Sequence, residues 1–352
     1  MTASLLFRPW KLGDVSVSNR IVMAPMATNR VSRNGEITDG LIRYLKRRAL
    51  GGCGMIIVES ATVDAEMGSS GRNLRLDSES CLPGLQLLSR ELHSLKVIVV
   101  AQLWHAGPRA QVKGQMPVSP SGVTVGPAVS RALEISEIQK IVQKFIEAGD
   151  RAACAEFDAV EIHAAHGYLL HHFIDRVTNR RSDVYGGSIE GRYRILGEIA
   201  SGLRSKHPTL PIILRLSLRE DDDAAAIAGI IEKFDFNAVD VRSGFSSMPA
   251  IETGKPPSPA YTLSLAQGLK IYSKKPVMTG GRILTVAQAE HAIMNGLDAV
   301  VLGRPLLADP DWVLKAASGQ PISLCLYDCD PSCYSRFKEG EELRCVYYDR
   351  RD

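Results

Sequence analysis

Eight short apolar runs recur along this chain of 352 residues, and segments with helical spacing or loops separate them. The runs consist largely of Val, Ile and Leu without strict polar alternation, which is typical of strands covered on both faces. They occupy residues 20–25, 55–59, 97–103, 159–163, 212–216, 238–242, 276–279 and 299–302. Strands and helices that alternate eight times predict a parallel sheet closed into a (β/α)8 barrel, the TIM barrel.

An open, doubly wound sheet is the alternative architecture for such an alternation. It would place a glycine-rich dinucleotide fingerprint, G-x-G-x-x-G, directly after an early strand. The sequence contains no such motif, and the nearest approach, Gly52-Cys53-Gly54, precedes a strand instead of following one. We therefore expect a single α/β barrel over residues 1–320, followed by a cysteine-rich extension of the same domain over residues 321–352.

The segment 105–132, after the third predicted strand, is too long and too rich in Pro and Gly for a simple connection. Loops of that length within a compact domain tend to be functional. We expect this one to form a lid near the carboxyl ends of the strands, where the active sites of TIM barrels lie.

Composition limits the class of partner. Hydrophobic residues make up 45% of the chain and charged residues 23%, as in ordinary globular proteins. A net charge of +3 without a basic block does not indicate a nucleic-acid partner. No secretory leader and no run of roughly 18 apolar residues is recognisable. We therefore expect a cytoplasmic protein that binds neither nucleic acid nor membrane. We also expect a homo-oligomer, although no pattern in the sequence shows the oligomeric state.

The stretch 158–194 contains a cluster of side chains that can donate or accept protons. Its strand ends at His163, and His166 and Tyr168 follow within five residues. A single histidine at a strand end is more often structural than catalytic. Together, however, two neutral imidazoles can donate two hydrogen bonds to one oxygen, and a nearby phenol can deliver a proton.

This stretch resembles a known family. HAAHGYLLHHF followed by NRRSDVYGGSIEGR is similar to the active-site motif of the Old Yellow Enzyme family of NADH:flavin oxidoreductases and ene-reductases. The resemblance implies an FMN-dependent ene-reductase, which takes hydride from transiently bound NAD(P)H and reduces the activated C=C bond of an enone or enoate. It further implies that His163 and His166 hold the substrate carbonyl oxygen, while Tyr168 donates the proton.

The other strand ends predict a cofactor site. The seventh and eighth strands end in glycines followed by arginine, the usual phosphate site of a TIM barrel; these residues are Gly280, Gly281, Arg282, Gly303 and Arg304. Arg215 ends an apolar strand and needs an anionic partner. By resemblance, Arg215 and Gln102 lie at the flavin pyrimidine edge, and the backbone of Ala24, Pro25, Met26 and Ala27 contacts the ring.

The C-terminal segment contains four clustered cysteines. NRIVMAPMATNR is similar to the branch with 2,4-dienoyl-CoA reductase and enoate reductase, many of whose members hold an iron–sulfur cluster through C-x2-C-x3-C-x11-C. Cys329, Cys333 and Cys345 fit this spacing, whereas the gap from Cys325 is one residue too long. We expect a [4Fe–4S] cluster, with a zinc site or an empty remnant as the alternatives. Its electrons would come from NAD(P)H through FMN or from a separate protein.

Two other functions remain open on the sequence alone. The first is a flavin amine dehydrogenase or demethylase on the same scaffold, although the histidine pair favours a carbonyl ligand. The second is a flavin or iron–sulfur electron-relay module, which would have no need of Tyr168. A barrel hydrolase or aldolase is disfavoured because no lysine or carboxylate pair stands out at the strand ends.

Overall fold

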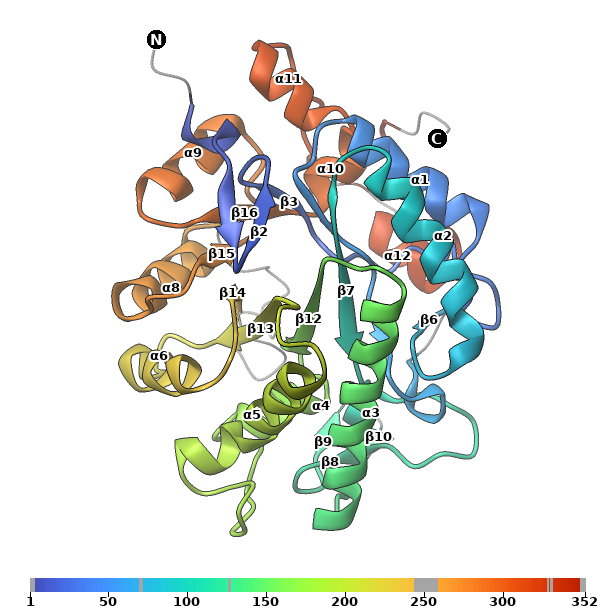
Figure 1. Cartoon of the computed structure of the whole chain (residues 1–352), viewed down its shortest axis with the longest axis vertical. Helices are drawn as coiled ribbons and strands as arrows, with labels where there is room; N and C mark the ends of the chain where they lie inside the picture. Colours follow the sequence, from blue (N-terminus) through green and yellow to red (C-terminus); the bar gives the residue numbers. More distant parts are fainter. Residues whose placement is uncertain are drawn as a thin grey trace.

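The computed structural model describes residues 4–69, 72–125, 128–243, 259–327, 329 and 332–348. Its central sheet has eight parallel strands that pair in the order β12, β13, β14, β15, β16, β3, β4 and β7. β7 pairs in turn with β12, so the sheet closes on itself. Figure 1 shows the helices arranged around these strands. The predicted TIM barrel is therefore confirmed.

All eight predicted barrel strands are present. They are β3 (Ile21–Met23), β4 (Met55–Ile57), β7 (Ile98–Trp104), β12 (Ala159–Ala164), β13 (Ile212–Leu218), β14 (Ala238–Ser243), β15 (Val277–Thr279) and β16 (Ala299–Leu302). Several of them continue one or two residues beyond the apolar run that predicted them. Polar side chains at the strand ends therefore belong to the sheet and are positioned by its hydrogen bonds.

The long helices that cover the barrel follow from the helical spacing of their apolar residues. They are α1 (Asp39–Leu50), α2 (Leu82–His93), α3 (Ile135–Cys154), α5 (Ile189–Lys206), α6 (Ala224–Lys233), α8 (Pro259–Tyr272) and α9 (Val286–Met294). Thr38, Ser188 and Thr285 cap three of them by accepting a backbone hydrogen bond. The helices α4 (Leu169–Ile174), α10 (Arg304–Ala308), α11 (Trp312–Ser318) and α12 (Cys333–Lys338) were not predicted, because they are too short to show a period.

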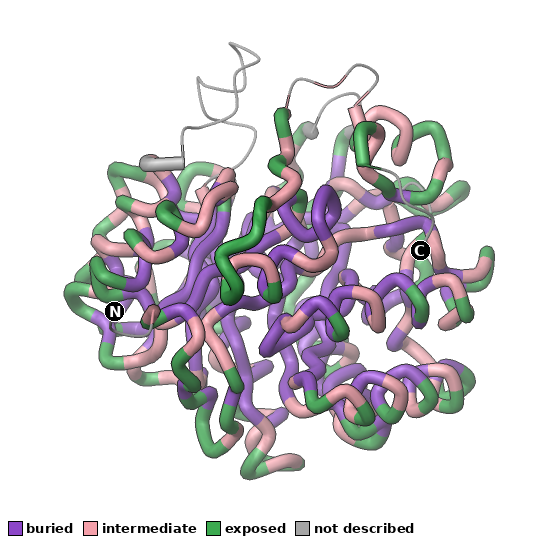
Figure 2. The backbone as a smooth tube through the Cα atoms, turned by 90° about the horizontal axis from the view of Figure 1, so that it is seen from above, coloured by how far each residue is buried: buried purple, intermediate pink, exposed green. Residues whose placement is uncertain are grey.

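Alternate residues of each strand face opposite sides of the barrel wall. In β14, Val239 and Val241 pack in the large apolar cluster that includes the helices, whereas Ala238 belongs to a separate cluster inside the barrel. Asp240 and Arg242 share the parity of Ala238 and therefore point inward. Figure 2 shows the strands as the most deeply buried part of the molecule.

The amino-terminal end of the barrel is covered by a hairpin of β1 (Trp10–Leu12) and β2 (Val15–Val17). Trp10, Leu12 and Val17 belong to the same apolar cluster as the inward residues of the strands. The interior is thus filled with apolar side chains at this end. Polar groups enter it only toward the carboxyl ends.

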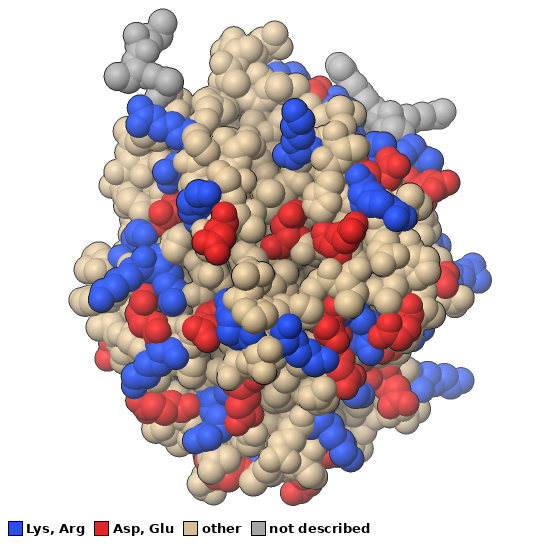
Figure 3. All heavy atoms as spheres, in the orientation of Figure 1, with Lys and Arg blue, Asp and Glu red and all other residues tan. Residues whose placement is uncertain are grey.

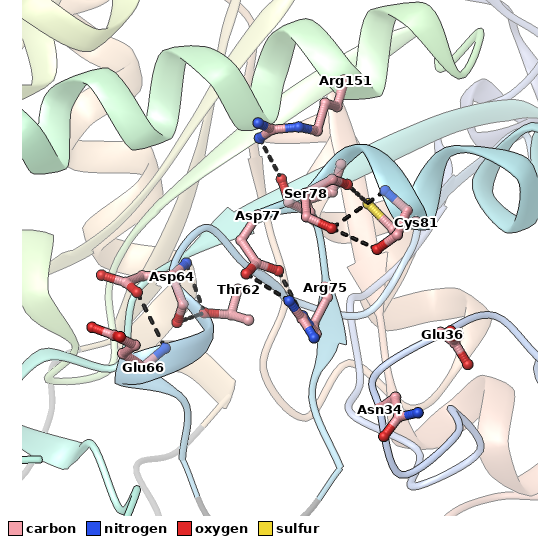
Figure 4. A network of polar contacts seen from close by, with 12 residues as sticks. Asn34, Glu36, Thr62, Asp64, Glu66, Arg75, Asp77, Ser78, Cys81 and Arg151 are labelled. Carbon is pink, nitrogen blue, oxygen red and sulfur yellow. Dashed lines mark hydrogen bonds and ion pairs between the residues drawn. The ribbon is translucent and has the colours of Figure 1, made fainter.

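The predicted lid, residues 105–132, contains short elements instead of a plain loop; residues 126–127 lie outside the described part. They are η4 (Gly107–Arg109), β8 (Val118–Ser119), β9 (Thr124–Val125), β10 (Ala128–Val129) and β11 (Arg131–Ala132). Beside it lie β5 (Ala61–Thr62) and β6 (Leu74–Arg75), which extend the sheet from β7. Arg75 and Asp77 form two hydrogen bonds there, of 2.7 and 2.9 Å (Figure 4).

The C-terminal extension packs against the loop that follows the first barrel strand. The Leu343 amide donates to the Thr28 carbonyl at 2.9 Å, and the Asn29 side chain donates to the carbonyls of Phe337 and Glu341. Figure 3 shows basic and acidic side chains interspersed on the face in view. None of the helices in the described ranges is both long and apolar enough to cross a membrane.

Candidate active site

His163, His166 and Tyr168 lie together at the carboxyl end of β12, as predicted. Nε2 of His163 and Nδ1 of His166 are 3.4 Å apart, and the two ring centroids are separated by 5.1 Å. The Tyr168 ring lies edge-on to His163 at 5.2 Å and to Trp104 at 5.1 Å. One oxygen atom placed beside the imidazole pair would therefore also be close to the phenol.

A left-handed turn brings these three side chains together. His166 has φ of 58° and Gly167 has φ of 70°. A non-glycine residue in this region costs on the order of 1–3 kcal/mol and persists only where its surroundings enforce it. The Ser217 hydroxyl of β13 accepts the His166 amide hydrogen at 3.2 Å and so supports the turn.

The protonation states suit a hydrogen-bonding pair and a proton donor. Burial, with the nearby positive charge of Arg215, holds the pKa of both His163 and His166 well below its ordinary value, so both rings are neutral near pH 7. Burial also raises the pKa of Tyr168, an effect that the Arg109 guanidinium partly opposes. The phenol therefore keeps its proton at neutral pH.

A layer of buried charge lies directly below the histidines inside the barrel. Nη1 of Arg215 is 3.2 Å from Asp240 and 3.5 Å from Glu161. Arg242 donates from Nη2 to the same Asp240 oxygen at 2.9 Å, and Gln102 donates to Glu161 at 2.6 Å. Arg215 thus has anionic partners within the protein, and Gln102 is held by the same network.

Glu161, Asp240 and Arg242 were not among the predicted site residues. The signal was present, because Glu161 and His163, like Asp240 and Arg242, alternate with apolar residues along a strand. Charged residues at alternate positions in an otherwise apolar barrel strand indicate inward-facing groups. For the sixth run, residues 238–242, we considered only the residues that follow it and so missed Arg242. Glu161 and Asp240 were missed because they lie inside their runs and not at the ends.

The predicted ring-binding and phosphate-binding segments are neighbours in the structure. A Cβ added at Gly303 would lie 3.3 Å from Sδ of Met26 and 3.6 Å from Cβ of Ala24, so the run Ala24–Ala27 meets the end of the eighth strand. A Cβ at Gly280 would lie 2.0 Å from the Val301 carbonyl oxygen and 2.4 Å from Nη1 of Arg242. Only glycine fits at position 280.

The two predicted phosphate-binding arginines share a partner in the C-terminal extension. The guanidinium carbon of Arg304 lies 3.9 Å from the Tyr327 ring centroid, and that of Arg282 lies 4.7 Å from it. Tyr327 and Arg282 both adopt positive φ, of 61° and 56°. The tyrosine between Cys325 and Cys329 therefore orders both cations, a contact that the sequence did not reveal.

The four C-terminal cysteines are free thiols, and all four line one small pocket together with Arg304. Partial burial raises the pKa of the Cys325 and Cys333 thiols, and the nearby positive charge of Arg304 opposes this. No group of three His, Cys, Asp or Glu side chains in the described ranges is placed to hold a metal ion. The cysteines are gathered, but the metal site stays a prediction.

Glu59, at the end of the second barrel strand, carries a buried carboxyl group. One oxygen accepts from the Thr28 amide at 3.1 Å and from the Thr28 hydroxyl at 2.5 Å, while the other has no hydrogen-bond partner among the described residues. Burial raises the pKa of this carboxyl to about 7. The group thus holds the loop after Ala27 and titrates near neutral pH.

We expect Glu59 to make stability fall as pH rises from about 5 to 7. The folded-state pKa of about 7 lies above the unfolded value of 4.5, so the folded protein binds more protons in this range. Urea unfolding at pH 5 and pH 8 should show that the free energy of unfolding of Glu59→Gln, relative to that of the wild type, rises by about 2.5 kcal/mol between the two pH values. Glu66→Gln, at an exposed glutamate, serves as the control, and a parallel dependence in all three proteins would contradict the expectation.

Several known proteins are similar to this chain. A sequence model of the NADH:flavin oxidoreductase / NADH oxidase family matches residues 5–323. NADH oxidase of Thermoanaerobacter brockii is 36% identical over 360 residues, an alignment that covers 97% of this chain and 55% of that protein. The chain thus spans about half the length of this relative.

Solved structures agree as well. 2-Naphthoyl-CoA reductase, determined in complex with 2-naphthoyl-CoA, matches with a TM-score of 0.88 at 27% identity, over 97% of this chain and 56% of that one. The Old Yellow Enzyme homologue of Zymomonas mobilis matches with a TM-score of 0.78 at 25% identity, over 91% of this chain and 94% of that one. The predicted resemblance is confirmed, and the chain belongs to the NADH:flavin oxidoreductase / NADH oxidase family.

Proposed function

We propose that this protein is an FMN-dependent ene-reductase that takes hydride from NAD(P)H and reduces the activated C=C bond of an α,β-unsaturated carbonyl compound. The observation that carries the proposal is the convergence of a neutral histidine pair and a protonated tyrosine at one barrel end. The family of the chain and the name of the NADH oxidase relative support the redox chemistry. The likeness to a reductase solved with 2-naphthoyl-CoA supports an acyl compound with conjugated unsaturation.

The barrel mouth is suited to FMN by its own chemistry. Buried polar atoms without a hydrogen-bond partner among the described residues gather there, including Nδ1 of His163, Nε of Arg215 and Oδ1 of Asp240. A polar heterocycle at the mouth could pair with several such atoms. Gly280 and Gly303 allow close backbone packing at the ends of the seventh and eighth strands, where a Cβ would lie 2.0 Å from the Val301 carbonyl oxygen and 3.3 Å from Sδ of Met26. Arg282 and Arg304, which follow these glycines in the chain, supply the cations that a phosphate site requires.

The FMN would supply hydride transfer, and side chains of this protein would bind the substrate carbonyl and donate the proton. His163 and His166 each offer one N–H to the substrate carbonyl oxygen, whose negative charge grows as the alkene accepts hydride. Because both rings are buried and neutral, this charge is met by hydrogen bonds that are already in place. Tyr168 then donates its phenolic proton to the substrate carbon opposite the one that receives hydride.

A [4Fe–4S] cluster held by Cys325, Cys329, Cys333 and Cys345 is part of the proposal. Its support is that the four thiols line one pocket beside Arg304. The extra residue between Cys325 and Cys329 departs from the spacing of similar cluster proteins. The cluster would add a one-electron centre close to the two arginines at the predicted phosphate site.

The experiment that tests the function starts with protein purified without air. Its absorption spectrum should show flavin bands with a broad cluster shoulder, and the flavin released on denaturation should be FMN. NADH or NADPH should bleach the flavin bands, and 2-cyclohexenone should restore them. Bleaching by an amine in place of NAD(P)H would indicate the amine dehydrogenase alternative, whereas no flavin at all would refute the proposal.

Tyr327→Ala is expected to weaken FMN binding about five- to thirtyfold. The change removes two cation–π contacts of on the order of 0.5–1 kcal/mol each, which hold Arg282 and Arg304 in place. Tyr327→Phe keeps the ring and should bind FMN like the wild type. Fluorescence titration of the apoprotein measures the dissociation constants. Equal values for Ala and Phe would show that the ring does not order the arginines.

A further inference from the structure

Arg242 lies at the mouth of the barrel between the two predicted halves of the cofactor site. It lies near the carboxyl end of β14, opposite Ser217 in the strand register, and is 7% exposed. Nε and Nη2 donate to one oxygen of Asp240 at 3.3 and 2.9 Å, which fixes the plane of the guanidinium. Nη1 is the nitrogen that lies 2.4 Å from the place a Cβ of Gly280 would take.

The order of the strands places Arg242 between the predicted ring-binding and phosphate-binding residues. Arg215 is on the fifth barrel strand and Gly280 and Gly303 follow the seventh and eighth, with the strand of Arg242 between them. If Arg215 faces the flavin ring and the glycines face the phosphate, the ribityl chain must pass between them. Among the described residues the bonds of Arg242 come from Nε and Nη2, while Nη1 lies against Gly280, in that interval.

The need to pair the buried carboxylate of Asp240 does not by itself account for Arg242. Asp240 already has Arg215 within 3.2 Å, and a second buried guanidinium beside the first is costly to desolvate. Buried charges are usually paired and their donors hydrogen-bonded, so a second guanidinium in the layer calls for further acceptors. The layer holds two guanidinium groups against two carboxylates, one of which, Glu161, has a pKa raised by burial to about 7.

We infer that Arg242 binds FMN directly: Nη1 donates to ribityl hydroxyl oxygens, and its charge joins that of Arg215 beside the pyrimidine edge. The inference rests on the proposed function, because it presumes FMN at the barrel mouth. Two consequences follow. Arg242 contributes to affinity for any flavin with a ribityl chain, phosphorylated or not. It also favours the reduced flavin, which carries more negative charge at that edge.

The test compares Arg242→Gln with Arg242→Lys and, as a control, with Arg204→Gln, which removes a guanidinium bonded at the far end of the barrel. Apoprotein is titrated with FMN and with riboflavin, and the midpoint potential of the flavin is measured against redox dyes. Arg242→Gln should bind both flavins about tenfold more weakly. If the reduced form loses a further tenfold, the potential falls by about 30 mV for a two-electron couple.

A double variant separates direct binding from support of Asp240. Asp240→Asn/Arg242→Gln removes the buried ion pair and restores the charge balance of the layer, yet its flavin affinity should stay low. Full recovery in the double variant would assign Arg242 a structural role and overturn the inference. Wild-type affinity in Arg242→Gln, or a loss confined to FMN with riboflavin unaffected, would overturn it too. A wild-type protein that binds no flavin would instead refute the proposed function itself.

Discussion

Tyr168→Phe is expected to slow reoxidation of the reduced flavin by an enone by about 10²–10⁴-fold, the usual loss when a positioned proton donor is removed. Reduction of the flavin by NAD(P)H should keep its wild-type rate, because that half-reaction needs no proton from the phenol. The ring itself remains, so the contacts with His163 and Trp104 persist. Stopped-flow absorbance measures the two half-reactions separately.

The matched control is Tyr193→Phe, which removes another buried phenol, located on α5. It should leave both half-reactions unchanged. If Tyr168→Phe turned over enones at the wild-type rate, the tyrosine would not be the proton donor, and the electron-relay alternative would gain support. Because the pKa of Tyr168 is raised by burial, the wild-type rate should not fall off as pH increases through 8.

Arg215→Met is expected to destabilise the fold by about 3–5 kcal/mol, the usual cost when one partner of a buried ion pair is lost. Glu161 and Asp240 would then share only Arg242, although both carboxyl groups are fully buried. The variant should also fail to retain flavin, since it lacks the cation beside the predicted pyrimidine edge. Urea unfolding of the apoprotein and flavin titration measure the two effects independently.

Two companion variants make this expectation sharper. Glu161→Gln/Arg215→Met removes one charge of each sign and should regain most of the lost stability while flavin binding stays weak. Arg215→Lys keeps the charge and should be intermediate in both measurements. At pH 8, above the pKa of about 7 of Glu161, an Arg215→Met protein as stable as the wild type would mean that the carboxylates are protonated or hydrated, contrary to the ion pairs described.

Local patterns in the sequence were enough to predict the barrel strands, the long helices and the His163/His166/Tyr168 cluster. Eight apolar runs without polar alternation were enough to predict the barrel, because strands covered on both faces leave that pattern wherever they occur. The long helices followed from their periodicity for the same reason. His163, His166 and Tyr168 could be predicted as one site because they are neighbours in the chain, joined by a single strand end and its turn.

Contacts between distant segments were beyond the reach of such patterns. The layer of Glu161, Arg215, Asp240 and Arg242 draws on three strands, and its pairings depend on the register in which β12, β13 and β14 meet. Tyr327 reaches Arg282 and Arg304 only because the extension folds back over the barrel mouth.

The sequence by itself thus determined the architecture and brought His163, His166 and Tyr168 to one strand end, where we propose that they handle the substrate. Only the tertiary structure decided how the buried charges are balanced and that Arg242 lies between Arg215 and the glycines that end the seventh and eighth strands. The physical reason is that periodicity and turn chemistry act within one segment. The energy of a buried charge, in contrast, depends on partners that barrel closure brings within a few ångströms.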